Sequence, residues 1–229
     1  MYKRQILAGL LLPILIVVRV LEGVDASWRP PIIAHAILVA FATHWLLWSF
    51  KSKKLSLRLL PVTVFALSAI PYPYQFEAKI IGVLTDWVVE VTGIVFHLLG
   101  RPVLAEGGMI QYDGIQVEVT EGCSGIQSLQ SLIMVSLYLG EFFRLRFSGR
   151  FFLLVLSVFI AITVNVGRAI SLAHIRFERG EFAFDSAHDR VGHIAFIIGG
   201  VLLLVASRAM VGASGRKGRR VKTTQIVAK

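Results

Sequence analysis

The chain has 229 residues, of which 55% are hydrophobic and only 17% are charged. Soluble domains carry about 25% charged residues, so this composition excludes an ordinary soluble globular domain. The formal net charge is +10, but most basic residues flank apolar runs, which indicates loops beside lipid head groups rather than a nucleic-acid surface.

We expect an all-α integral membrane protein with a single transmembrane domain over residues 1–213. Apolar segments of the length that crosses about 30 Å of hydrocarbon predict about six membrane-spanning helices. A basic cytoplasmic tail at 214–229 follows, and we expect it to be disordered. The predicted spans are residues 5–21, 31–50, 57–75, 123–142, 150–172 and 188–210.

Clusters of Lys and Arg set the expected orientation, because short basic loops stay on the cytoplasmic side. These clusters lie at the N-terminus and at 51–58, 142–150 and 216–229. If all four are cytoplasmic, an even number of crossings separates each pair. Three apolar segments lie between the second and third clusters, so one of them does not cross. Both termini are then cytoplasmic.

The segment that we expect not to cross is 79–99. It carries Lys79, Asp86, Glu90 and His97 within an otherwise apolar run. Their spacing places all four on one side of a helix, which predicts an amphipathic helix lying in the outer interface. The alternative is a true span whose polar stripe is buried in a helix bundle.

The outer loop, residues 100–122, contains a hairpin signal. Asp113-Gly114 separates "MIQY" from "IQVEV", and this dipeptide between strand formers predicts a two-residue β-hairpin. We expect a short β-hairpin that acts as a lid, and the alternative is a mere connector.

Cys123 is the only cysteine, which excludes an intramolecular disulfide and a multi-thiolate metal site. It begins the fourth predicted span, and a helix N-terminus favours the thiolate. Backbone N–H groups of Ser124 and Gly125 are candidate donors to an oxyanion. Glu121 works against the thiolate if its carboxylate is close. Taken alone, a cysteine at a membrane surface is more often structural than catalytic.

Asn165 and Arg168 lie three residues apart at the predicted outer end of the fifth span. They share a helix face, so Asn165 can orient the guanidinium. An arginine within a span is costly and usually functional. The alternative is that Arg168 extends to the lipid head groups.

The last span begins with His188 and Asp189 at its outer end, and His193 follows deeper. A histidine there can act as general base and acid. Three spans thus deliver Cys123, Arg168 and His188 to one membrane face. The sequence contains no metal-binding or nucleotide-binding motif, so we expect no metal and no cofactor.

With these residues, the sequence resembles the exosortase/archaeosortase family of membrane cysteine transpeptidases. The resemblance rests on "EGCSGIQSL", "NVGR" and "HDRVG" and covers about residues 57–210. It implies that Cys123 corresponds to the family's nucleophile, Arg168 to its arginine and His188 to its histidine. Family members often have an aromatic residue where this chain has His193, so either His188 or His193 is left as the proton-transfer group.

The resemblance also implies the substrates: proteins with a C-terminal sorting motif, a transmembrane helix and a basic cluster, of which PEP-CTERM tails are the best-known type. The enzyme would cleave the tail at the extracytoplasmic face of the cell membrane and transfer the protein to a lipid or envelope acceptor. Two alternatives stay open. One is a membrane cysteine protease that only hydrolyses, and the other is a non-enzymatic membrane assembly or transport factor.

Overall fold

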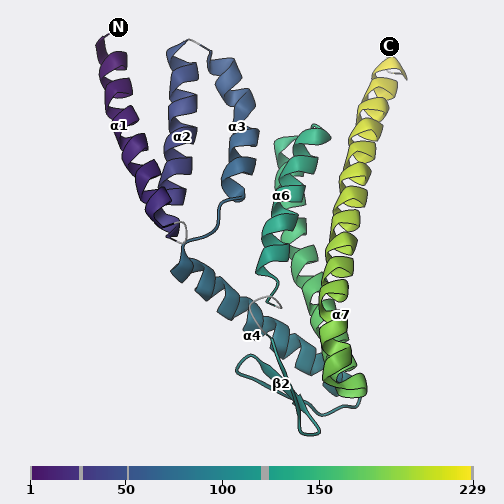
Figure 1. Ribbon diagram of the computed structural model, residues 1–229. Helices are drawn as coiled ribbons and strands as arrows, with labels where there is room; N and C mark the ends of the chain where they lie inside the picture. Colours follow the sequence, from purple (N-terminus) through teal and green to yellow (C-terminus); the bar gives the residue numbers. More distant parts are fainter. Residues whose placement is uncertain (1, 26–27, 51, 120–123, 228–229) are drawn as a thin grey trace. The chain divides into compact units, whose positions relative to one another are not determined.

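The computed structural model describes residues 2–25, 28–50, 52–119 and 124–227, which form helices and one small sheet (Figure 1). The chain divides into two compact units, Met1–Ala78 and Lys79–Lys229, called unit 1 and unit 2 below. Its helices are α1 (Tyr2–Val24), α2 (Arg29–Ser49), α3 (Lys53–Ser68), α4 (Tyr74–Leu98), α6 (Ile126–Phe142) and α7 (Phe147–Val227). Its strands are β1 (Leu104–Glu106), β2 (Met109–Tyr112) and β3 (Ile115–Glu118).

Three helical segments within the described ranges are long and apolar enough to cross a membrane. They are Arg29–Ser49, Tyr74–Leu98 and Phe147–Val211. The first and last coincide with predicted spans, whereas the second is the segment that we expected to lie in the interface. The helices α3 and α6 have 16 and 17 residues. The complete six-span topology therefore stays a prediction.

Proline residues set the helix ends in unit 1. Two prolines occupy the first turn of α2, where the missing N–H costs nothing. The expected span 57–75 ends early, because α3 stops at Ser68. Pro71 and Pro73 follow closely; each lacks a backbone N–H donor and disfavours the helical conformation of the residue before it. Residues 74 and 75 belong instead to α4.

The helix α4 has three distinct faces. Val88, Val89, Thr92 and Phe96 are buried against the rest of unit 2. The predicted polar stripe of Lys79, Asp86, Glu90 and His97 is exposed. Between them runs an exposed apolar stripe made of Val83, Trp87, Val91, Ile94 and Leu98. The described residues of unit 2 leave this polar stripe uncovered, while α4 is also long and apolar enough to cross a membrane, so the interfacial helix and the true span both stay open.

The predicted hairpin is confirmed, and the structure adds a third strand. Strands β2 and β3 pair antiparallel with Tyr112 opposite Ile115. The turn residues Asp113 and Gly114 have φ values of 49° and 78°, as a type I′ turn requires. Strand β1 pairs with β2 on the other side, so the outer loop forms a three-stranded antiparallel sheet.

One face of this sheet packs on helices. Val103, Ile110 and Val119 are buried in one cluster with α4 and α7. Phe177 of α7 contacts both α4 and the sheet, because its ring lies 5.5 Å from the ring of Phe96 in α4 and 5.4 Å from the ring of Tyr112 in β2. The sheet is therefore anchored to α7 one to three helical turns from Arg168.

The helix α7 is broken at Gly180, where φ is 78° and ψ is −172°. We call residues 147–179 its first arm and residues 181–227 its second arm. The two arms run side by side next to α6 (Figure 1), and they share a core with it through Leu132, Leu153 and Leu203. The predicted spans leave residues 173–187 unassigned, and the structure shows that helix continues there to the break from both sides.

The second arm also extends further than expected. Its helix runs to Val227, through a segment that we expected to be disordered from residue 214. The residues there include several Arg and Lys, which are good helix formers, and no proline.

Candidate active site

The site begins where the chain enters α6. Gly125 is the N-cap of this helix and has a φ of 86°, a conformation that costs other residues about 1–2 kcal/mol. A Cβ atom added to Gly125 would lie 2.5 Å from Cγ of Asn165. Position 125 therefore requires glycine for two reasons: its backbone has a positive φ, and α7 approaches too closely to leave space for a Cβ atom. Both Ser124 and Asn165 are buried, with 1% and 4% of their surface exposed.

The break at Gly180 brings Arg168 and His188 together. Arg168 lies on the first arm of α7 and His188 on the second, and Nη2 of the arginine is 3.3 Å from Nε2 of the histidine. Gly192, one turn after His188, leaves room for the guanidinium, because a Cβ there would lie 3.3 Å from Cζ of Arg168. The structure thus joins the two predicted side chains across 20 residues of sequence.

These contacts determine the tautomer of His188. An arginine has only donors, so Nε2 of His188 accepts from Arg168 and carries no proton in this arrangement. The other ring nitrogen, Nδ1, lies 3.1 Å from Oδ1 of Asp189 and donates its proton to that carboxylate. Asp189 is itself largely exposed, at 87% of its side-chain surface. The lone pair at Nε2 therefore faces Arg168, and the N–H at Nδ1 faces Asp189.

The remaining predicted site residues are distributed as follows. Cys123 and Glu121 lie outside the described residues, and Ser124 and Gly125 directly follow Cys123 in the chain. His193 is exposed, and no hydrogen bond joins its side chain to Arg168 in the described part of the chain. Asn165 and Arg168 share one face of the first arm, as their spacing predicted.

Sequence reasoning missed the contribution of α4 to this region. A small cavity beside the start of α6 is lined by Leu84, Trp87, Val88, Ser124, Gly125, Leu129, Ala161, Ile162 and Asn165. Three of these residues come from α4, which we had treated only as a surface helix. The signal was present in the apolar spacing of Val88, Val89, Thr92 and Phe96, which predicts a packed helix face.

The fold and the site together define a class: a helical protein with segments long and apolar enough to cross a membrane, and with an arginine and a histidine paired between the two arms of α7. The model of the transmembrane exosortase family (Exosortase_EpsH) matches residues 2–205, and the chain belongs to this family. Membership implies a membrane transpeptidase that processes sorting signals.

The match covers both units, whereas the three motifs recognised in the sequence lie within residues 121–192, in unit 2. No curated protein and no solved structure matches the chain.

Proposed function

We propose that the chain is a membrane cysteine transpeptidase in which Cys123, Arg168 and His188 carry out the reaction. The observation that carries the proposal is the Arg168–His188 contact of 3.3 Å across the two arms of α7. Asn165, one turn before Arg168, packs on Gly125, and Gly125 is two residues after Cys123. Since consecutive Cα atoms are about 3.8 Å apart, the nucleophile belongs to the same neighbourhood.

In the first half-reaction, His188 gives up its contact with Arg168, and its Nε2 takes the proton from the Cys123 thiol. The thiolate attacks the carbonyl carbon of the scissile peptide bond, and N–H groups of Arg168 stabilise the oxyanion that forms. The C–N bond then breaks, and His188 returns its proton to the leaving amine. The N-terminal part of the substrate stays attached to Cys123 as a thioester.

In the second half-reaction, His188 takes the proton of the acceptor nucleophile, which attacks the thioester carbonyl. The C–S bond breaks, and Cys123 regains a proton from His188. Arg168 cannot replace His188 in these steps, because its guanidinium does not lose a proton in proteins. The geometry favours His188 over His193 for this role, since His188 contacts Arg168.

The three-stranded sheet is proposed as the lid over this site. The backbone N–H of Val119 donates to the carbonyl of Gly108 at 2.8 Å, which ties the end of the sheet four residues before Cys123. Four residues span at most about 14 Å, so the proposal puts the sheet within that reach of the nucleophile. A cover at this position would exclude water and favour transfer over hydrolysis.

The test uses the purified full chain and a tagged substrate from the same cell that ends in a sorting motif, an apolar helix and a basic cluster. We expect cleavage, and transfer to an added amine such as hydroxylamine. Cys123→Ala, Arg168→Ala and His188→Ala should each lower the rate by about 10²–10⁴ at normal protein level. The control Gly200→Ala should leave the rate unchanged, because no atom lies within 4 Å of the added Cβ.

Two results would contradict parts of the proposal. Full activity of Cys123→Ala would exclude cysteine catalysis and favour a non-enzymatic role. A product that always ends in a free carboxylate, even with abundant amine, would identify an enzyme that only hydrolyses.

A further inference from the structure

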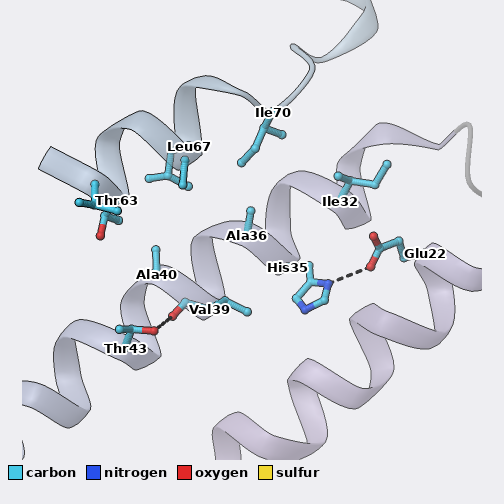
Figure 2. A pocket seen from close by; sticks show the side chains of 12 residues that line it. Glu22, Ile32, His35, Ala36, Val39, Ala40, Thr43, Thr63, Leu67 and Ile70 are labelled. Atoms are coloured by element: carbon cyan, nitrogen blue, oxygen red, sulfur yellow. Dashed lines mark hydrogen bonds and ion pairs between the residues drawn. The ribbon is translucent and has the colours of Figure 1, made fainter. Parts of the chain in front are cut away.

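Unit 1 contains a pocket of about 450 Å³ between α2 and α3, far in sequence from the site in unit 2. Figure 2 shows its long axis running along both helices, with Glu22 of α1 at one end. The lining consists of Glu22, Ile32, His35, Ala36, Val39, Ala40, Thr43, Val62, Thr63, Ala66, Leu67 and Ile70. Most of these side chains are apolar, and several are small.

The length of the pocket fits one leaflet of a bilayer. Thr43 follows Ile32 by 11 residues on α2, which is about 16 Å at 1.5 Å per residue. The hydrocarbon core is about 30 Å thick, so one leaflet contributes about half of that. The groove therefore has the length and the apolar lining of a site for a single acyl chain.

The inner end of the pocket offers no hydrogen-bond donor. The hydroxyl of Thr43 donates to the carbonyl of Val39 at 2.8 Å. The hydroxyl of Thr63 donates to the carbonyl of Leu59 at 3.1 Å. Just beyond them, His44 joins the two helices, with Nδ1 at 2.8 Å from Ser56 Oγ and Nε2 at 2.9 Å from Thr63 Oγ1. The polar groups at this end are thus already hydrogen-bonded to the protein, which suits the methyl end of a chain.

The carboxylate of Glu22 lies at the other end of the pocket, and one of its oxygens can accept a further hydrogen bond. Oε2 of Glu22 accepts from His35 Nδ1 at 2.8 Å and from Arg19 Nη1 at 2.7 Å. No donor within the described ranges lies on Oε1, which points away from His35 in Figure 2. The hydrogen bonds from His35 and then Arg19 lower the pKa of Glu22, so its charge persists below neutral pH.

Arg19 supplies the opposite charge beside it. The side chain of Arg19 is 67% exposed, so its remaining N–H groups are available outside the pocket. A carboxylate and a guanidinium side by side at the mouth of an apolar groove match a zwitterionic head group. The ammonium would bind Glu22 and the phosphate would bind Arg19, since charged hydrogen bonds to both are strong.

We propose that unit 1 binds one phospholipid with a primary ammonium head group, with one acyl chain in the groove between α2 and α3. The ammonium donates an N–H to Oε1 of Glu22. A phosphatidylcholine has the same charges but no N–H donor on its nitrogen, so the site discriminates between the two head groups. This inference does not depend on the transpeptidase reaction.

The test is native mass spectrometry of the purified, delipidated full chain after addition of dioleoyl-phosphatidylethanolamine or dioleoyl-phosphatidylcholine. We expect one molecule of the ethanolamine lipid to be retained about ten-fold better, which corresponds to one hydrogen bond to a charged group. Glu22→Gln should abolish this preference while a lipid stays bound. Ala40→Leu, which fills the groove, should abolish retention of both lipids, whereas the control Ala42→Leu on the same helix should not.

Equal retention of the two lipids by the unchanged chain would overturn the proposal, and so would full retention by Ala40→Leu. A dimer that dissociates in Ala40→Leu, with no lipid retained by the unchanged chain, would show that a second copy occupies the groove and would also overturn it. None of these readouts changes if the transpeptidase proposal fails.

Discussion

In unit 2, the close approach of α7 to the start of α6 restricts which residue can stand at position 125. Gly125 needs a left-handed conformation and also has no space for a Cβ beside Asn165. Because Asn165 shares a helix face with Arg168, any atom added at Gly125 pushes on the helix that holds the guanidinium. The glycine of the "CSG" sequence therefore positions the site, although it has no chemical group to contribute.

We expect Gly125→Ala to lower transfer activity by about ten-fold or more, since the backbone strain of about 1–2 kcal/mol adds to the steric conflict with Asn165. The measurement is the transfer rate per molecule of enzyme in detergent. Gly200→Ala is the matched control, because a Cβ there meets no atom within 4 Å. Equal rates for the two variants would show that the close approach is unimportant.

At the scale of elements, the break in α7 is what creates the Arg168–His188 pair. Gly180 has a φ of 78° and a ψ of −172°, a region that is essentially restricted to glycine. Without this break the first and second arms would form one continuous helix. Arg168 and His188 would then lie about 30 Å apart at 1.5 Å per residue.

Gly180→Ala should therefore destabilise unit 2 by about 1–3 kcal/mol. In a chain of this size that lowers the apparent melting temperature by about 2–12 °C. Thermal unfolding of the purified protein in detergent measures the effect, with Gly82→Ala as control because its added Cβ also meets nothing. An unchanged melting temperature for Gly180→Ala would mean that the chain reverses by another route.

The faces of α4 make a prediction about its place in the membrane. Lys79 and His97 are both exposed and lie about 27 Å apart along the helix at 1.5 Å per residue. If α4 lies in the outer interface, cysteines at both positions in a Cys123→Ser background react with a membrane-impermeant maleimide on intact cells. Lys54→Cys, in a predicted cytoplasmic loop, should react only after lysis.

A helix that crosses the membrane would give a different labelling result. Only one of Lys79→Cys and His97→Cys would then react before lysis, because the helix is nearly as long as the hydrocarbon core is thick. That outcome would also contradict the six-span topology with both termini in the cytoplasm.

Local chemistry explains what the sequence could predict. The hairpin at Asp113-Gly114 was predictable because its turn type demands those residues. The helix end at Ser68 was also accessible, since Pro71 and Pro73 follow it, but the apolar pattern continues past it and led to an overlong span. Hydrophobicity alone does not report where backbone hydrogen bonding stops.

Other features depend on tertiary packing and were not accessible. Nothing in the sequence near Gly180 indicates that helix continues to that residue from both sides, because "RFERGEFAF" is polar enough to suggest a loop. The 3.3 Å contact between Arg168 and His188 requires the reversed chain. The sequence predicts both residues as site candidates from their positions at the ends of spans, but it does not predict the direct contact between their side chains.

At the scale of the whole molecule, the family match spans nearly the entire chain, from residue 2 to residue 205. It therefore includes unit 1, which contains none of the proposed catalytic residues. The pocket in unit 1 gives this part of the chain a separate proposed task, the binding of a lipid, while unit 2 holds the residues proposed for the chemistry.

The most direct test of the proposed chemistry is the covalent intermediate. The unchanged enzyme, incubated with tagged substrate without an added amine and quenched in acid, should show an added mass equal to the N-terminal substrate fragment on the peptide that contains Cys123. Hydroxylamine should remove that mass, because it cleaves thioesters. Absence of any adduct on Cys123 in the unchanged enzyme, while that enzyme still cleaves the substrate, would contradict the account.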